Sequence, residues 1–131
     1  MYNTVDHASS IEIDIEDVDP DALFSESLLA LSDVLSDAGG GTVVTHEVQV
    51  SGPDLEGLLV AWINELVHLA EDDGFVPERA YRERLDEETF RARVAGERGI
   101  PRERIREVRC RSVGLKQLDD GAWSARVKLD C

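Results

Sequence analysis

The sequence contains few aromatic residues, few lysines, few cysteines and no long apolar run. Aromatic residues make up 5% of the 131 residues, so the core must be built mainly from Val, Leu, Ile and Ala. No apolar stretch approaches the ~18 residues that a membrane-spanning helix needs. The first residues show neither a basic start nor an apolar run, so we expect no secretory signal and predict a cytoplasmic protein with no membrane partner.

The two cysteines, Cys110 and Cys131, are too few for a disulfide framework or a cysteine-based zinc site. In a reducing cytoplasm we expect both thiols to be free. The sequence also lacks a Gly-rich phosphate loop, a nucleophile elbow and a His-Glu-x-x-His motif. The three histidines, His7, His46 and His68, lie far apart along the chain. We therefore expect that the protein is not an enzyme.

Negative charge dominates, with 28 acidic and 14 basic residues and a formal net charge of -14. Only two of the basic residues are lysines. Because neutralising phosphates drives nucleic-acid binding, this balance argues against strong direct binding of RNA or DNA. A basic partner protein or a metal ion fits better. An equally good explanation is adaptation to a salty cytoplasm, where screening weakens self-repulsion.

Hydrophobic periodicity and turn residues divide the chain into two helical segments and several strands. The predicted strands cover residues 10–16, 42–50, two segments within 79–96, 105–118 and 123–129, and the predicted helices cover 20–37 and 55–73. This order predicts one domain over residues 1–131, of the α/β class and more strictly α+β. Its expected architecture is a two-layer sandwich with two helices packed on a mixed sheet.

The residues most suited to chemistry are a set of oxygen donors near the two ends of the chain. Asp130 and the main-chain carboxylate of Cys131 follow the last predicted strand, while Ser10, Glu12 and Asp14 share one face of the first strand. If these strands are neighbours, their polar faces could converge on a hard cation, which prefers oxygen ligands. The alternative is that these acidic faces are simply solvated.

Three segments of the chain resemble the archease family. The first runs from 7 to 37 and opens with His-Ala-Ser-Ser-Ile-Glu-Ile, similar to the family's His-Thr-Ala-Asp-Ile/Val opening. The second runs from 50 to 66 and contains Ser-Gly-Pro-Asp-Leu-Glu followed by Leu-Leu-Val-Ala-Trp-Ile-Asn-Glu-Leu. The third, from 121 to 131, ends in Trp-Ser-Ala-Arg-Val-Lys-Leu-Asp-Cys. Together they cover most of the chain in the family's order.

The resemblance implies an archease-like fold and an accessory role. Archease activates the RtcB-type GTP-dependent RNA ligase of tRNA splicing by promoting the guanylylation that restores the ligase after each turnover. The implied partner is therefore that ligase. The family also binds a divalent cation, calcium, through the Asp of its opening motif, the penultimate Asp and the C-terminal carboxylate. The corresponding residues here are Ser10, Asp130 and Cys131.

This chain departs from the family pattern at Ser10, where the family has Asp. A hydroxyl offers an oxygen but no charge, so the resemblance implies a weakened or lost cation site, unless Glu12 or Asp6 replaces the missing carboxylate. An alternative function follows, in which the chain is an archease-fold chaperone or modulator of another RNA-processing protein, such as a tRNA methyltransferase. A small hydrolase or transferase ranks last, because no nucleophile or general base is visible.

Overall fold

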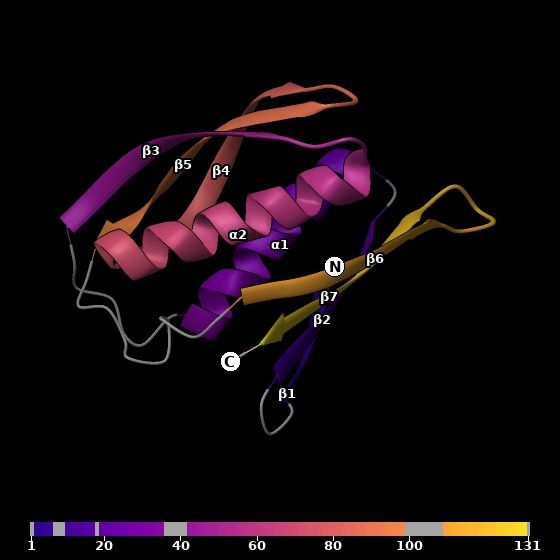
Figure 1. The fold of residues 1–131 in the computed structure, drawn as a ribbon, viewed down its shortest axis with the longest axis horizontal. Coiled ribbons are helices and arrows are strands. Elements are labelled where there is room, and N and C mark those ends of the chain that lie inside the picture. The colour runs from indigo at the N-terminus through magenta and orange to yellow at the C-terminus, as the bar shows by residue number, and fades with distance from the viewer. Residues whose placement is uncertain (1, 7–9, 18, 36–41, 99–108, 131) are drawn as a thin grey trace.

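The computed structural model describes residues 2–6, 10–17, 19–35, 42–98 and 109–130. They form two helices and seven strands (Figure 1). In chain order the elements are β1 (Tyr2–Asp6), β2 (Ser10–Asp17), α1 (Pro20–Leu35), β3 (Thr42–Ser51), α2 (Leu55–Asp73), β4 (Phe75–Leu85), β5 (Thr89–Arg98), β6 (Arg109–Gln117) and β7 (Trp123–Asp130).

The strands form two antiparallel sheets. One has four strands in the order β1-β2-β7-β6, and the other has three in the order β3-β5-β4. The α+β class and its two helices are confirmed. The expected single mixed sheet is corrected, because β3 does not return beside β2 but joins a separate sheet. Periodicity identifies a strand and its faces, whereas partner choice depends on contacts distant in sequence.

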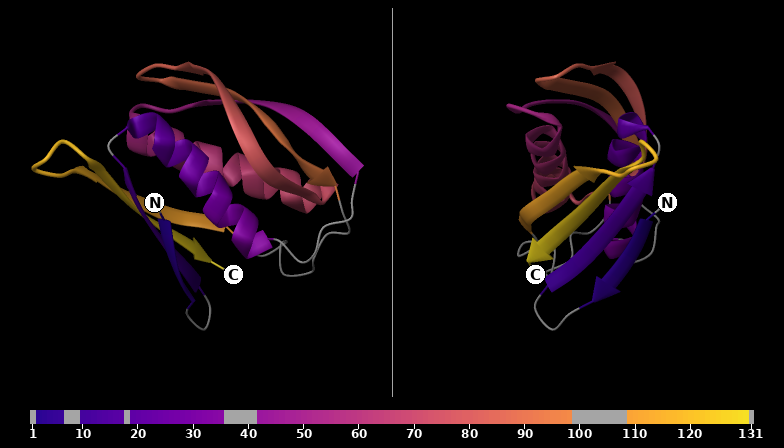
Figure 2. Two further views of the ribbon diagram at one scale, coloured as in Figure 1. Left: turned by 180° about the vertical axis from the view of Figure 1, so that it is seen from behind. Right: turned by 90° about the vertical axis from the view of Figure 1, so that its right-hand side faces the viewer.

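The helices lie between the two sheets, and each helix contacts strands of both (Figures 1 and 2). Their apolar stripes meet the inward faces of the strands in one continuous core. At its centre, Phe24 stacks on Phe90 with ring centroids 4.0 Å apart, and Trp62 meets Phe90 edge to face at 5.0 Å. The Trp62 indole N–H donates to the Phe24 carbonyl at 3.0 Å. Trp62 is therefore a core residue.

Local signals explain where α2 begins and ends. Asp54 is extended and its side chain accepts a hydrogen bond from the Gly57 N–H at 2.7 Å, which caps the helix. Gly74 ends the helix at φ 64°, a left-handed conformation that glycine adopts at little cost. The sequence therefore stops this helix before Phe75, where β4 begins.

Two hairpins turn where the sequence carries turn-forming residues. Asp86 organises the β4–β5 turn by accepting hydrogen bonds from the N–H groups of Glu88 at 3.0 Å and Thr89 at 2.8 Å. The β6–β7 turn contains Gly121 at φ 88°, as expected of an Asp-Asp-Gly turn. Residues 105–108 of the predicted hairpin lie outside the described residues.

The largest differences from the sequence prediction concern β4 and β1. Strand β4 begins at Phe75, earlier than the predicted 79, because its first residues pair with the end of β5. Strand β1 was missed. Its sequence Tyr-Asn-Thr-Val-Asp has no clear alternation, and pairing with the strongly patterned β2 is what makes it a strand.

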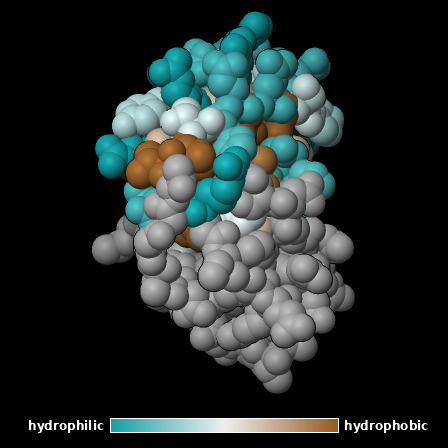
Figure 3. Space-filling view, turned by 90° about the vertical axis from the view of Figure 1, so that its left-hand side faces the viewer, coloured by the Kyte–Doolittle hydropathy of each residue, from teal (hydrophilic) through white to brown (hydrophobic). Residues whose placement is uncertain are grey.

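Polar side chains predominate in the described part of one end of the molecule (Figure 3). Figure 3 shows the end of the molecule where β3 begins and α2 ends, with apolar areas among mainly polar side chains. The large apolar side chains recorded as exposed in the described part are Leu29, Val43 and Tyr81. None of the helices in the described residues is long and apolar enough to cross a membrane.

Candidate functional site

The backbone register brings two of the three predicted cation ligands together. In the antiparallel pair of β2 and β7, Ser10 lies directly opposite Asp130. On its other side Asp130 lies opposite Arg109 of β6. Cys131 lies outside the described residues. Ser10 and Asp130 thus meet at one end of the four-stranded sheet, although 120 positions separate them in the sequence.

The next positions along this ladder carry opposite charges. Glu12 lies opposite Lys128, and Asp14 lies opposite Arg126. The Arg126 Nε atom is 3.0 Å from Asp14 Oδ1 and 3.6 Å from Glu12 Oε1. The hydrogen bond and charge of Asp14, followed by the charge of Glu12, raise the pKa of Arg126. The acidic face of β2 is therefore matched by cations on β7, a feature that the sequence analysis missed.

This charge pairing bears on which residue could replace the family's Asp. Glu12 is two residues from Ser10 on the same strand, and its side chain is only 21% exposed because it lies against Arg126. A cation that recruited Glu12 would have to compete with that guanidinium. Asp6 pairs with Ile11 rather than with Ser10, so it does not lie in line with the Ser10–Asp130 pair across the sheet. The register therefore favours neither replacement.

The donor set matches a hard cation in type but has few charges. A serine and an aspartate occupy opposed register positions, and both residue types carry oxygen ligands of the kind that calcium accepts. Within the described part of the chain, no group of three or more His, Cys, Asp or Glu side chains could hold a metal ion. The predicted site, which includes Cys131, extends beyond that part and stays a prediction.

Structural roles account for the two described histidines and for Trp123. His46 is half-buried on β3, with its ring 4.7 Å from Phe75 in an edge contact. His68 is exposed on α2. Trp123 is partly buried and packs against the core.

The segment most similar to archease, Gly-Pro-Asp-Leu-Glu, is explained by structural needs. A Cβ atom at Gly52 would lie 2.8 Å from backbone atoms of Gly57 and Leu58, so only glycine fits there without a shift. Asp54 caps α2. Glu56 Oε1 accepts a hydrogen bond from the Leu115 N–H at 3.0 Å, which joins the first turn of α2 to edge strand β6.

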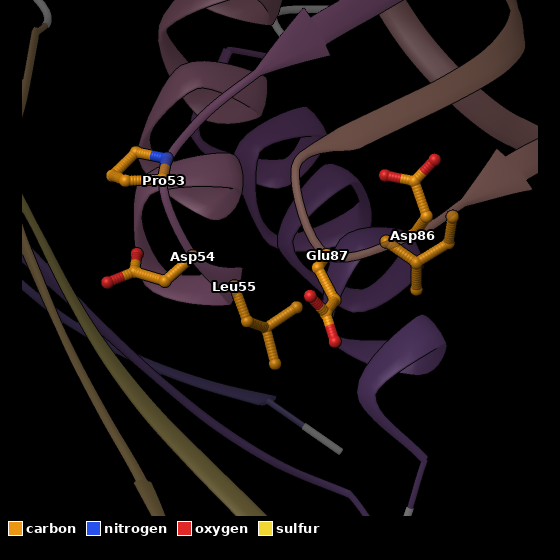
Figure 4. Close-up of a pocket in the computed structure, with 6 residues that line it drawn as sticks. Pro53, Asp54, Leu55, Asp86 and Glu87 are labelled. Atoms are coloured by element: carbon orange, nitrogen blue, oxygen red, sulfur yellow. The ribbon is translucent and has the colours of Figure 1, made fainter.

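A hollow of about 500 Å³ lies beside this turn (Figure 4). Its walls come from the turn before α2 and from the β4–β5 turn, and the Leu55 and Glu87 side chains lie close together across it. Asp54 and Asp86 also line it, but each carboxylate accepts hydrogen bonds from its own turn. The hollow therefore results from the shapes of the two turns and is not lined by a set of polar side chains that converge on one point.

Comparison with known proteins supports the same family and fold. The model of the archease protein family (MTH1598/TM1083) matches residues 2–131. Protein archease of Methanosarcina mazei is 30% identical over 138 residues, covering 98% of this chain and 94% of the relative. Protein archease of Methanosarcina acetivorans is 31% identical over 139 residues, with the same coverage. The solution structure of Methanobacterium thermoautotrophicum protein 1598 has the same fold, with a TM-score of 0.70 at 18% identity, covering 99% of this chain and 98% of the other.

Proposed function

Since this chain belongs to the archease family, we propose that it is a cytoplasmic accessory protein that activates an RtcB-type GTP-dependent RNA ligase in tRNA splicing. It would act by promoting ligase guanylylation and turnover, not by catalysing a reaction itself. The observation that supports the proposal is the register of β2 and β7, which places Ser10 opposite Asp130, two of the three residues that the family resemblance implies as cation ligands.

In this proposal the cation-binding tip consists of Ser10, Asp130 and the main-chain oxygens of Cys131. These residues would hold a divalent cation, calcium by family resemblance, through oxygen atoms. The bound ion would supply a positive charge at the end of an otherwise acidic protein, able to contact a phosphate or carboxylate of the ligase. Asp130 provides the negative side chain of the set, so it is the residue whose loss matters most.

A second candidate is supported by the charges around the tip. Ser10 lacks the family's carboxylate, and the nearby carboxylates Glu12 and Asp14 are already paired with Arg126. A chain with such a weakened site could serve as a chaperone or modulator of another RNA-processing protein, such as a tRNA methyltransferase. Its complex with that partner would then be insensitive to chelators.

Multiple-turnover RNA ligation by the ligase of the same organism tests the first proposal. We expect the native protein to stimulate turnover and Asp130→Ala to abolish stimulation while leaving the fold intact. Asp119→Ala is the matched control, because it removes the same group from the exposed turn before β7. Full stimulation by Asp130→Ala would refute the role of the tip.

The Ser10→Asp variant separates the two candidates. Restoring the second carboxylate should tighten calcium binding by about tenfold or more, measured by isothermal titration calorimetry. A native protein that stimulates turnover supports the ligase role. No stimulation by the native protein, combined with a gain by Ser10→Asp, would support the second candidate instead.

A further inference from the structure

The three-stranded sheet is net positive, as are strands β6 and β7 of the other sheet. Its strands β3, β4 and β5 contain six of the 14 basic residues and only four of the 28 acidic residues. All six basic residues are arginines, on β4 and β5. These strands are therefore net positive in a chain whose formal charge is -14.

The outer face of this sheet points away from the helices (Figure 1). Along β5 the side chains of Phe90, Ala92 and Val94 are buried, whereas Arg93 between them is exposed. Tyr81 of β4 lies directly opposite Arg93 and is 52% exposed. An aromatic ring and a guanidinium thus occupy neighbouring positions on an open sheet surface.

A second guanidinium completes the group. Arg79 Nη1 donates a hydrogen bond to the Tyr81 hydroxyl at 3.3 Å, and Arg79 is itself exposed. We call Arg79, Tyr81 and Arg93 the Tyr81 patch. The guanidinium of Arg79 therefore lies beside the phenol oxygen of Tyr81.

The two arginines of the Tyr81 patch keep their charge available. The nearby carboxylates Glu47 and Glu83 lie 3.4 Å and 3.7 Å from Arg91. Among the described residues, no ion pair with a carboxylate is recorded for Arg93 or Arg79, and the hydrogen-bond partner of Arg79 is the neutral hydroxyl of Tyr81. Glu47 also occupies the register position opposite Arg93, and the charge of Glu78 acts on Arg79. Within the described residues neither carboxylate forms an ion pair with these two arginines, so the Tyr81 patch keeps two positive charges.

We propose that the Tyr81 patch binds a short segment of single-stranded RNA, with one base stacked on the Tyr81 ring and backbone phosphates contacted by Arg79 and Arg93. A flat sheet face with an exposed aromatic ring is a common platform for unpaired bases. Guanidinium groups match phosphate geometry through paired N–H donors. An acidic protein segment would satisfy the arginines but would make no use of the exposed ring, so RNA is the occupant that explains all three residues.

The inference goes beyond the proposed function and revises the sequence-based argument in one respect. The net charge of -14 still opposes RNA binding as a whole. The local surplus of arginine permits a weak contact, with a Kd expected in the range of about 10⁻⁴ to 10⁻⁵ M at moderate salt. Such a contact suits a protein that works beside RNA held mainly by another protein.

Fluorescence anisotropy with a fluorescein-labelled oligouridylate tests the inference on the full chain, without any ligase. Its outcome is therefore independent of the proposed function. We expect Tyr81→Ala to weaken binding about tenfold, whereas Tyr81→Phe, which keeps the ring, should bind within about twofold of the native protein. Arg93→Ala should reduce the slope of log K against log salt by about 0.7. Lys116→Ala, which removes an exposed cation from the other sheet, is the matched charge control.

Several results would overturn the inference. They are the absence of saturable binding, equal binding by Tyr81→Ala and the native protein, or equal losses in Lys116→Ala and Arg93→Ala. Tighter binding of polyglutamate than of oligouridylate, with no dependence on Tyr81, would assign the patch to an acidic protein partner. Because all the substituted side chains are exposed, circular dichroism should show native folding in each variant.

Discussion

The hydrogen bond between Glu56 and Leu115 tests whether the most family-like segment serves stability or function. Strand β6 is an edge strand, so one side of its backbone has no strand partner. The Glu56 carboxylate, in the first turn of α2, accepts the Leu115 N–H at 3.0 Å and so ties that edge to the helix. Replacing Glu56 with Ala removes the acceptor and leaves the half-buried N–H group of Leu115 without this hydrogen bond.

The expected loss follows from the burial and charge of this contact. A hydrogen bond to a charged group contributes about 1.5–3 kcal/mol to stability. Leu115 and Glu56 are both only partly buried, so water can replace some of the lost interaction. We therefore expect Glu56→Ala to lower the free energy of unfolding by about 1–2 kcal/mol. For a domain of this size that corresponds to a decrease in Tm of roughly 4 °C per kcal/mol.

Urea and thermal unfolding, followed by circular dichroism, measure this change. Glu56→Gln is the matched control, because its amide oxygen can still accept the bond and most of the stability should return. Hydrogen exchange at the Leu115 amide should accelerate in Glu56→Ala and stay slow in Glu56→Gln. Under conditions where both variants are folded, ligase stimulation should equal that of the native protein. Native stability in Glu56→Ala, or an equal loss in both variants, would refute the reasoning.

Two further predictions concern packing and pH. A Cβ atom at Gly96 would overlap the Val76 carbonyl oxygen and lie 2.9 Å from Pro77 Cα, so Gly96→Ala should lower the free energy of unfolding by about 1–3 kcal/mol or more in urea titrations. Gly114→Ala, whose Cβ would meet nothing within 4 Å, should be neutral or slightly stabilising, and similar losses in both would contradict this account. Backbone N–H donors of its own turn, foremost that of Glu88, lower the pKa of Asp86 below its ordinary 3.8. The contribution of Asp86 to stability is therefore complete above the ordinary pKa of the carboxyl group and is lost as the pH falls through the folded-state pKa. The stability difference between the native protein and Asp86→Ala should therefore shrink in acid. A difference that grows there would contradict this sign.

Local patterns were sufficient for most elements. The alternation of Ile11, Ile13 and Ile15 identified β2, and the Asp-Asp-Gly turn identified the last hairpin, because both signals are contained in a few neighbouring residues. Strand β1 escaped detection because its pattern is weak and its conformation depends on β2. The number of sheets also escaped detection, because no local signal states which strand pairs with which.

The candidate site likewise combines features that the sequence predicted with one that only the structure revealed. The sequence named Ser10 and Asp130 through family resemblance, and it showed that acidic residues alternate along β2. It did not show that β7 aligns Arg126 with Asp14 and near Glu12, which decides how much of that acidity is available to a cation.

What the sequence determined by itself was therefore most of the elements, their buried faces and the family, since these depend on periodicity, turn residues and matched segments. Only the tertiary structure decided the two sheets, the charge pairing beside the tip and the neighbouring positions of Arg93 and Tyr81. The physical reason is register. A shift of one residue between strands moves every side chain to the opposite face, and register is set by packing of the whole core, not by any one segment.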